Sequence, residues 1–263
     1  MQGLYCRPDC RHEADVTQPG FKREREMFQI PKPCVAIADS SRQFPVHRIY
    51  CVGRNYAAHA RESGADPDRE APFYFMKPAD AVMPNGSHIP YPPRTRDLHH
   101  EIELVVAIGT GGSNIPVAGA LSHIFGYAVG IDLTRRDLQT EAKNAGRPWD
   151  TSKGFDHSAP VSAIHPVADV KHPSRGRIWL KVNGISRQEG DLGELIWSVP
   201  EAIAELSTLF TLAPGDLIFT GTPAGVGALQ PGDKVTGGVE GVDEISIGIS
   251  EGTASRNPSH NKN

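Results

Sequence analysis

Residues 98–108 read LHHEIELVVAI, and the rest of the chain is best interpreted from this stretch outward. In a strand, Glu101 and Glu103 project from one face, and a valine and an alanine continue that face at the next two odd positions. The even positions from 102 to 108 carry only isoleucine, leucine and valine. Because both faces are apolar beyond the glutamates, we predict a central strand over Glu101–Gly109 that is covered on both sides.

The surrounding sequence predicts an α+β fold that is rich in strands. Its 27 glycines and 22 prolines favour turns and short strands over long helices. Further strands are expected at Phe28–Asp39, Val46–Val52, Gly126–Leu133, Arg177–Val182, Asp216–Thr220 and Glu244–Ile249. Short helices are expected at Tyr56–Gly64, Pro116–Phe125, Arg135–Ala145 and Ser198–Leu209. The proline-rich segment Asp66–Arg96 is expected to be a loop with brief extended pieces, and Arg147–Pro160 a long connection. Asn183 and Gly184 suit the two positive-φ positions of a tight hairpin turn.

The composition excludes several classes of protein. Lysine and arginine (27) are fewer than aspartate and glutamate (31), so there is no overall positive field to hold a nucleic acid. No uninterrupted apolar run approaches the roughly 20 residues of a membrane span. The polar N-terminus does not resemble a secretion signal, and the four cysteines fit a reducing compartment. We therefore expect a cytoplasmic protein with no nucleic-acid or membrane partner.

Three acidic residues are candidates for a metal site. Glu101 and Glu103 would repel each other at the mouth of a covered strand unless a positive charge lay between them. A divalent cation would supply that charge, although a strand that begins at the surface would leave both glutamates in water. Asp132 closes the next predicted strand, where it either joins the glutamates or caps the helix that follows. Three carboxylates without a thiolate or imidazole favour Mg²⁺, with Mn²⁺ or Ca²⁺ as substitutes.

A histidine and a glutamate lie three residues apart in the first predicted helix. His59 and Glu62 would share one face, where the carboxylate fixes the tautomer of the imidazole and raises its basicity. Such a pair can act as a general base on water. The alternative is a surface helix with an incidental ion pair.

Other polar residues could hold a small acid. Arg136 and Gln139 share a helix face, and Lys153 lies in the following connection; their charges could bind a carboxylate or stabilise an enolate. The alternative is a solvated helix start. The glycine-rich residues 221–227 lack the lysine of a phosphate-binding loop, so we exclude nucleotide binding there. The hydroxyl of Thr222 could still contact a small acid.

Taken in order, these segments resemble the fumarylacetoacetate hydrolase family. The resemblance spans Val46–Ile249 and rests on Gly53-Arg54-Asn55-Tyr56 with His59 and Glu62, Glu101-x-Glu103, Asp132 with Arg136 and Gln139, Lys153, and Gly221–Gly227. The runs Phe75–Val82, Asp97–Glu103 and Gly146–Asp150 are most similar to the fumarylpyruvate hydrolase branch.

The resemblance implies a fold of rolled mixed sheets, a homodimer and a divalent metal, Mg²⁺ first, held by Glu101, Glu103 and Asp132. It implies that a lid carries His59 and Glu62. Residues 1–45 would then be an N-terminal extension with a leading strand, residues 46–250 the catalytic domain, and residues 251–263 a polar tail.

The implied activity is hydrolysis of the carbon–carbon bond of a 2,4-dioxo acid. Fumarylpyruvate, cleaved to fumarate and pyruvate in gentisate-type aromatic catabolism, is the expected substrate. His59, Glu62 and Lys153 would be catalytic, and Arg136, Gln139 and Thr222 would bind the substrate. The alternatives are an oxaloacetate decarboxylase, a general acylpyruvate hydrolase and, more distantly, a non-catalytic binding module stabilised by its metal.

Overall fold

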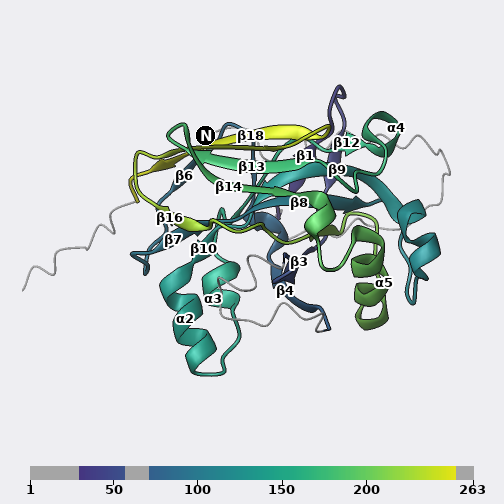
Figure 1. The fold of residues 1–263 in the computed structure, drawn as a ribbon, viewed down its shortest axis with the longest axis horizontal. Coiled ribbons are helices and arrows are strands. Elements are labelled where there is room, and N and C mark those ends of the chain that lie inside the picture. The colour runs from purple at the N-terminus through teal and green to yellow at the C-terminus, as the bar shows by residue number, and fades with distance from the viewer. Residues whose placement is uncertain (1–29, 57–70, 253–263) are drawn as a thin grey trace, which may run out of the picture.

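The computed structural model describes residues 30–56 and 71–252. His59, Glu62 and nearly all of the predicted helix Tyr56–Gly64 lie outside these residues, as do most of the N-terminal extension and of the tail. Within them, the chain folds into packed mixed sheets with a few short helices (Figure 1). The expected β-rich α+β fold is confirmed.

The largest sheet places the predicted central strand in its middle. Its strands run in the order β4-β3-β15-β8-β9-β11-β5, with β12 paired to β9. Their bounds are β3 Ile49–Gly53, β4 Phe73–Lys77, β5 Val82–Pro84, β8 Ile102–Ile108, β9 Ile124–Ile131, β11 Ala159–Val161, β12 His165–Pro166 and β15 Leu217–Phe219. All seven residues of β8 are buried, as expected for a strand covered on both faces.

A second sheet packs against the first. It has the order β14-β13-β17-β18-β6, with bounds β6 His88–Pro90, β13 Arg177–Val182, β14 Ile185–Asp191, β17 Lys234–Val239 and β18 Asp243–Ser250. Figure 1 shows β13 and β18 above β8, and residues of the two sheets are in contact. The hairpin β13–β14 turns at Asn183 (φ 52°) and Gly184 (φ 80°), which confirms the predicted turn.

Two smaller sheets complete the strands. One has the order β10-β7-β16, with β7 Leu98–His100, β10 Thr134–Arg135 and β16 Gly227–Leu229. The other pairs β1 Cys34–Ala36 with β2 Gln43–Pro45. The observed strand β8, Ile102–Ile108, is therefore slightly shorter than the predicted strand Glu101–Gly109. Glu101 lies between β8 and the short strand β7.

The helices are short and lie at the edges of the sheets. They are α2 Arg136–Asn144, α3 Asp150–Lys153, α4 Val167–Val170, α5 Val199–Leu209 and three 3₁₀ helices, η1 Ala79–Ala81, η2 Val117–His123 and η3 Leu192–Glu194. In Figure 1, α2 and α3 lie side by side at one end of the molecule. Among the described residues, no helix has the length and apolar character needed to cross a membrane.

Each face of β8 belongs to a different hydrophobic core. Val105 and Ala107 pack into a cluster with residues of β3, β11 and β15. The even residues of β8 pack into a larger cluster between the two main sheets. The prediction that β8 is apolar on both faces is thus confirmed. Glu101 and Glu103 precede Val105 and Ala107 on one of these faces.

Three predicted segments differ from the structure. Within the described part of Phe28–Asp39, only Cys34–Ala36 is a strand, because β1 pairs with nothing but the short β2. By contrast, the brief extended pieces predicted within Asp66–Arg96 are present as β4, β5 and β6, and β4 pairs with β3 along its full length. The connection Arg147–Pro160 contains the helix α3. The predicted helix Pro116–Phe125 is a 3₁₀ helix over its middle residues.

Candidate active site

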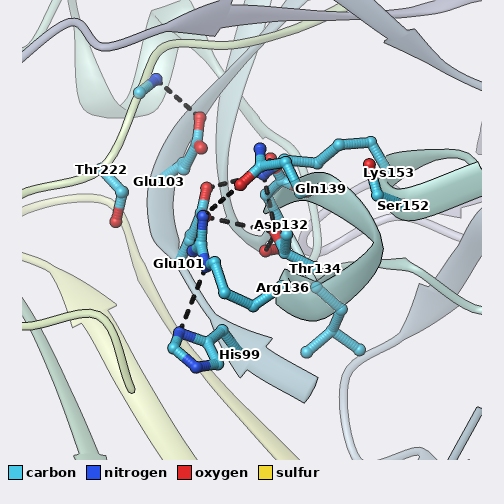
Figure 2. A network of polar contacts seen from close by, with 12 residues as sticks. His99, Glu101, Glu103, Asp132, Thr134, Arg136, Gln139, Ser152, Lys153 and Thr222 are labelled. Atoms are coloured by element: carbon cyan, nitrogen blue, oxygen red, sulfur yellow. Dashed lines mark hydrogen bonds and ion pairs between the residues drawn. The ribbon is translucent and has the colours of Figure 1, made fainter. Parts of the chain in front are cut away.

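Three carboxylates converge where β8 begins and β9 ends. These strands are antiparallel with Ile102 opposite Ile131, so Glu101 and Asp132, the next residues outward, lie beside each other. The backbone N–H of Asp132 donates to the carbonyl of Glu101 at 2.8 Å. One oxygen from each of Glu101, Glu103 and Asp132 lies within 4.8 Å of the others, and all three residues are buried (Figure 2). The alternative of solvated glutamates is therefore wrong.

Asp132 is not a helix cap. The residue that caps α2 is Arg135, and it makes no side-chain capping bond. The carboxylate of Asp132 instead lies 2.7 Å from Nζ of Lys77 and 2.6 Å from Nζ of Lys153. The sequence left both roles for Asp132 open, and the structure places it in the acidic cluster.

Lys153 is brought to the cluster by α3. Its ammonium donates to Oε2 of Glu101 at 2.8 Å, to Oδ2 of Asp132 at 2.6 Å and to Oγ1 of Thr134 at 2.7 Å. Burial lowers the pKa of this lysine, but the two carboxylates outweigh burial and raise it above its ordinary value. Lys153 is therefore a firmly charged, buried ammonium.

Arg136 and Gln139 lie on the face of α2 that points to the cluster. The guanidinium of Arg136 forms an ion pair with Oε1 of Glu101 and donates to Oε1 of Gln139 at 2.5 Å and to Nδ1 of His99 at 3.3 Å (Figure 2). The expected contact between residues three apart is thus present. The alternative of a solvated helix start is wrong for Arg136.

Glu103 is the least compensated of the three acids. It is 2% exposed, and its Oε2 accepts a hydrogen bond from the backbone N–H of Gly221 at 2.6 Å. Within residues 30–56 and 71–252, no lysine, arginine or histidine lies within ion-pair distance of it. Burial, together with the charges of Asp132 and Glu101, raises its pKa well above the ordinary value. A buried carboxylate without a cationic partner, beside two others, fits a divalent cation with oxygen ligands.

Gly221 is required at this position. Its φ is +99°, and a Cβ atom there would lie 2.7 Å from Cβ of Asn55. Only glycine allows the backbone to approach closely enough to donate to Glu103. The glycine-rich loop thus serves as a wall of the site.

Thr222 is held by a buried amide. Nε2 of Gln188 donates to Oγ1 of Thr222 and to the carbonyl of Pro223, both at 2.8 Å. Oε1 of the same amide accepts the backbone N–H of Ile102 at 3.2 Å, which fixes its orientation because a backbone N–H can only donate. Since Oγ1 already accepts a hydrogen bond, the hydroxyl hydrogen of Thr222 remains available to a ligand.

These groups line one cavity together with a second set of side chains. Glu101, Glu103, Lys153 and Thr222 are part of its lining. The lining also includes aromatic and cationic side chains: Arg54, Phe73, Phe75, Lys143 and Trp149. The cavity therefore combines acidic groups with aromatic and positively charged side chains.

The structure brings together seven of the nine predicted site residues: Glu101, Glu103, Asp132, Arg136, Gln139, Lys153 and Thr222. His59 and Glu62 lie outside the described residues. Sequence reasoning missed Lys77, Thr134, Gln188 and the cavity wall. The sequence contained an indication for Lys77. It ends the apolar run Phe73–Lys77, and a lysine that is buried is expected to have a charged partner. Nothing in the sequence indicated a site role for Gln188, since it lies in a polar strand whose other residues are exposed or partly exposed.

Comparisons with known proteins found a matching family and several relatives. The family described as fumarylacetoacetate (FAA) hydrolase C-terminal matches residues 48–251. The fumarylpyruvate hydrolase of a Ralstonia species is 47% identical over 184 residues, which cover 70% of this chain and 95% of that protein. The mitochondrial oxaloacetate tautomerase of Rattus norvegicus is 46% identical over 194 residues, which cover 74% of this chain and 87% of that protein.

A solved structure is similar over almost the same region. The crystal structure of fumarylpyruvate hydrolase from Pseudomonas aeruginosa, in complex with Mn²⁺ and pyruvate, matches with a TM-score of 0.85 and 49% identity. The match covers 86% of this chain and 100% of that chain.

Proposed function

Because this chain belongs to the fumarylacetoacetate hydrolase family and is a hydrolase that acts on carbon–carbon bonds, we propose that it cleaves fumarylpyruvate to fumarate and pyruvate. The observation that carries the proposal is the convergence of three buried carboxylates with Lys153 in one cluster. The relative from Pseudomonas aeruginosa, solved with Mn²⁺ and pyruvate, supports the same keto acid product. We place the reaction in gentisate-type aromatic catabolism.

The three acids would hold the divalent cation, for which we propose Mg²⁺. When bound, such an ion supplies a Lewis acid that stabilises negative charge on a keto acid oxygen. The Mn²⁺ in the relative from Pseudomonas aeruginosa supports a divalent ion as the cofactor of this chain. Mn²⁺ and Ca²⁺ are the expected substitutes because they accept the same ligands.

The keto acid end of the substrate would lie against Thr222, Arg136 and Gln139. The available hydroxyl hydrogen of Thr222 would donate to the substrate carboxylate. Arg136 and Gln139, which line the same cavity, would orient it. These residues bind and position the substrate but exchange no proton with it.

Two residues outside the described part of the chain complete the reaction. Glu62 would orient His59, which takes a proton from water. The resulting hydroxide adds to the distal carbonyl carbon, and the bond between that carbon and its methylene neighbour breaks. The electron pair leaves with the methylene carbon as pyruvate enolate, whose charge the Lys153 ammonium stabilises until that carbon takes up the proton that His59 removed from water. The distal fragment leaves as fumarate.

The test follows the ultraviolet absorbance of fumarylpyruvate. Loss of absorbance with Mg²⁺, its absence with chelator, and fumarate and pyruvate in equal amounts are the expected result. Purified, metal-loaded enzyme that leaves the absorbance unchanged would refute the assignment. Running Mn²⁺ and Ca²⁺ in parallel identifies the preferred ion.

Action on oxaloacetate is the second candidate, favoured by the 46% identity to a tautomerase of that acid. An oxaloacetate decarboxylase would need the same stabilised enolate but no activated water. The substitution His59→Ala separates the two, because hydrolysis should collapse while decarboxylation should continue. A general acylpyruvate hydrolase would instead cleave substrates with an uncharged distal group equally well.

We also propose a homodimer in the cytoplasm. The dimer rests on the family resemblance, and light scattering after size exclusion should give twice the 28.4 kDa chain mass. The buried thiol of Cys51, which forms no disulfide within the described residues, supports a reducing compartment. Fractionation of the source cells tests the location.

A further inference from the structure

The lining of the cavity that holds Glu101 and Glu103 also carries two cations and three aromatic rings. Arg54 and Lys143 lie there with Phe73, Phe75 and Trp149. They come from separate parts of the chain: the residue after β3, the helix α2, the strand β4 and the start of α3. Neither cation has a role in the reaction described above.

The rings form a continuous surface. Phe73 meets Trp149 edge to face, with ring centroids 5.4 Å apart and planes at 88°. Phe75 packs on the same tryptophan at 5.7 Å, and Nζ of Lys153 stands 4.9 Å from the Phe75 ring. The aromatic surface therefore begins beside the catalytic lysine and leads away from it.

The two cations stand on this surface. Nζ of Lys143 is 5.3 Å from the Trp149 ring, and the guanidinium carbon of Arg54 is 5.5 Å from the Phe73 ring. Among the residues that the structure describes, no carboxylate forms an ion pair with either. The buried Nε of Arg54 likewise has no hydrogen-bond partner there. Arg136, by contrast, forms an ion pair with Glu101.

Burial and the neighbouring cations lower the pKa of Lys143. Partial burial lowers its pKa below the ordinary value, and the nearby charges of Arg54 and Arg136 lower it further. An anionic ligand stabilises positive charges that lie close together and have no ion-paired carboxylate.

The backbone holds Arg54 in an unusual conformation. Its φ is +55°, in the left-handed region that residues other than glycine seldom adopt. The next residue, Asn55, fixes the segment by donating to the carbonyls of Trp197 at 2.9 Å and Thr220 at 2.8 Å. Strain that the surrounding structure maintains is typical of binding sites.

We propose that Arg54 and Lys143 form a subsite for a carboxylate at the distal end of the substrate, with its planar chain against Phe73 and Trp149. The subsite rests on the proposed function and specifies its substrate class: 2,4-dioxo acids that carry a second carboxylate. The keto acid head lies beside Glu101 and Glu103, and the distal carboxylate lies beside Arg54 and Lys143.

The test compares two substrates in wild type, Lys143→Gln and Arg54→Gln. Fumarylpyruvate has a distal carboxylate, whereas 2,4-dioxopentanoate ends in a methyl group. The subsite predicts that each variant lowers the ratio of kcat/KM for the first substrate over the second by roughly tenfold or more, mainly through KM.

Matched controls exist elsewhere in the chain. Lys181 stands 5.3 Å from the Trp179 ring, the same separation as in the Lys143–Trp149 pair, and Arg177 stands 5.8 Å from it. Neither lines the cavity. Lys181→Gln and Arg177→Gln should leave the ratio at its wild-type value. The two test variants lie on different elements, so poor folding of one leaves the other informative.

A binding measurement separates the subsite from the reaction. Fumarate, titrated while tryptophan fluorescence is followed, should bind wild type and bind Lys143→Gln at least several-fold more weakly. If neither dioxo acid is cleaved but this difference holds, only the proposed function fails. If fumarylpyruvate is cleaved while the substrate ratio and the fumarate affinity of Lys143→Gln match those of Lys181→Gln, the subsite is overturned. If wild type neither cleaves the dioxo acids nor binds fumarate, both fail.

Discussion

Lys77 carries a positive charge into a place that solvent does not reach. Its side chain is 0% exposed, and its ammonium lies 2.7 Å from Oδ1 of Asp132. It also donates to the backbone carbonyls of Leu133, at 3.1 Å, and of Lys153. One side chain on β4 thus ties together the residues that follow β9 and the end of α3. Lys77 positions both an acid and the lysine of the proposed reaction.

The substitution Lys77→Met should destabilise the metal-free protein by about 3–5 kcal/mol. It removes one of the two ammonium groups that compensate the buried carboxylate of Asp132, and the carbonyls of Leu133 and Lys153 lose a donor. Urea unfolding in the presence of chelator measures the loss. The control Lys181→Met, at a half-buried position on β13, should change the free energy of unfolding by less than about 0.5 kcal/mol. Equal losses in both variants would mean that Lys77 contributes only ordinary packing.

Gln188 offers a test of the hydroxyl orientation of Thr222. Gln188→Glu keeps the oxygen that accepts from Ile102 but replaces the donor amide by a second acceptor. The Thr222 hydrogen would then turn toward the new carboxylate, and KM for the dioxo acid should rise roughly tenfold with a smaller change in kcat.

A double-mutant cycle with Thr222→Val checks this assignment. The valine should cost little further in the Gln188→Glu background, because the useful hydrogen bond is already lost. Additive effects of the two substitutions would contradict the coupling.

At the scale of single residues, the sequence predicted the site residues whose role is indicated by the residues next to them in the chain. Glu101, Glu103 and Asp132 stand at strand ends, where the alternation of β8 and the apolar run of β9 locate them. Lys77 and Gln188 act through partners 55 and 34 residues away, at Asp132 and Thr222. Contacts at such separations depend on tertiary packing, which a local pattern does not contain.

At the scale of elements, helices and hairpins with a clear sequence pattern were predicted well, and very short helices and strands were predicted poorly. The helices Arg136–Asn144 and Val199–Leu209 and the hairpin at Asn183 agree with the sequence because periodicity and turn residues specify them. Helix α3 has four residues, too few for a periodic signal, yet it delivers Lys153. Strand β4 lies between prolines and was predicted only as a brief extended piece of a loop.

Strand β3 illustrates how an element responds to pH. Burial, followed by the charge of Asp132, raises the pKa of Cys51 well above its ordinary value of 9.0. Above pH 9 the unfolded chain loses this proton while the folded chain keeps it. The unfolded state then binds fewer protons, so the contribution to stability is complete below pH 9 and falls as pH rises.

Between pH 8 and pH 10, wild type should therefore lose roughly 1 kcal/mol more stability than Cys51→Ala. Urea unfolding at both pH values gives the difference. Val52→Ala, which shortens the adjacent buried side chain without removing a titratable group, should lose stability in parallel with wild type. A Cys51→Ala curve that is also parallel would contradict the prediction.

At the scale of the whole molecule, the acids lie where two layers and two cores meet. Strand β8 has one face in each core, and Glu101 and Glu103 stand at the end where it begins. A ligand that binds these acids therefore stabilises the whole fold. Burying Glu103 without a cation costs free energy that metal binding would return.

The substitution Glu103→Gln should leave the metal-free protein at least as stable as wild type, since the amide oxygen still accepts from Gly221 and the buried charge is gone. Wild type should gain about 2.7 kcal/mol at a Mg²⁺ concentration of 100 Kd, whereas the variant should gain little. Thermal melts with Mg²⁺ and with chelator measure both effects. Glu244→Gln, at an exposed position, should behave as wild type; an equal gain in Glu103→Gln would exclude Glu103 as a ligand.

The position of β4 has a practical consequence for protein engineers. Phe73 and Phe75 lie on an edge strand, whereas the acids belong to β8 and β9 in the interior of the same sheet. Edge positions tolerate replacement better than central ones, because fewer neighbours depend on them. A library that randomises Phe73, Phe75 and Lys143 would therefore explore new distal groups while leaving the bond-breaking machinery intact.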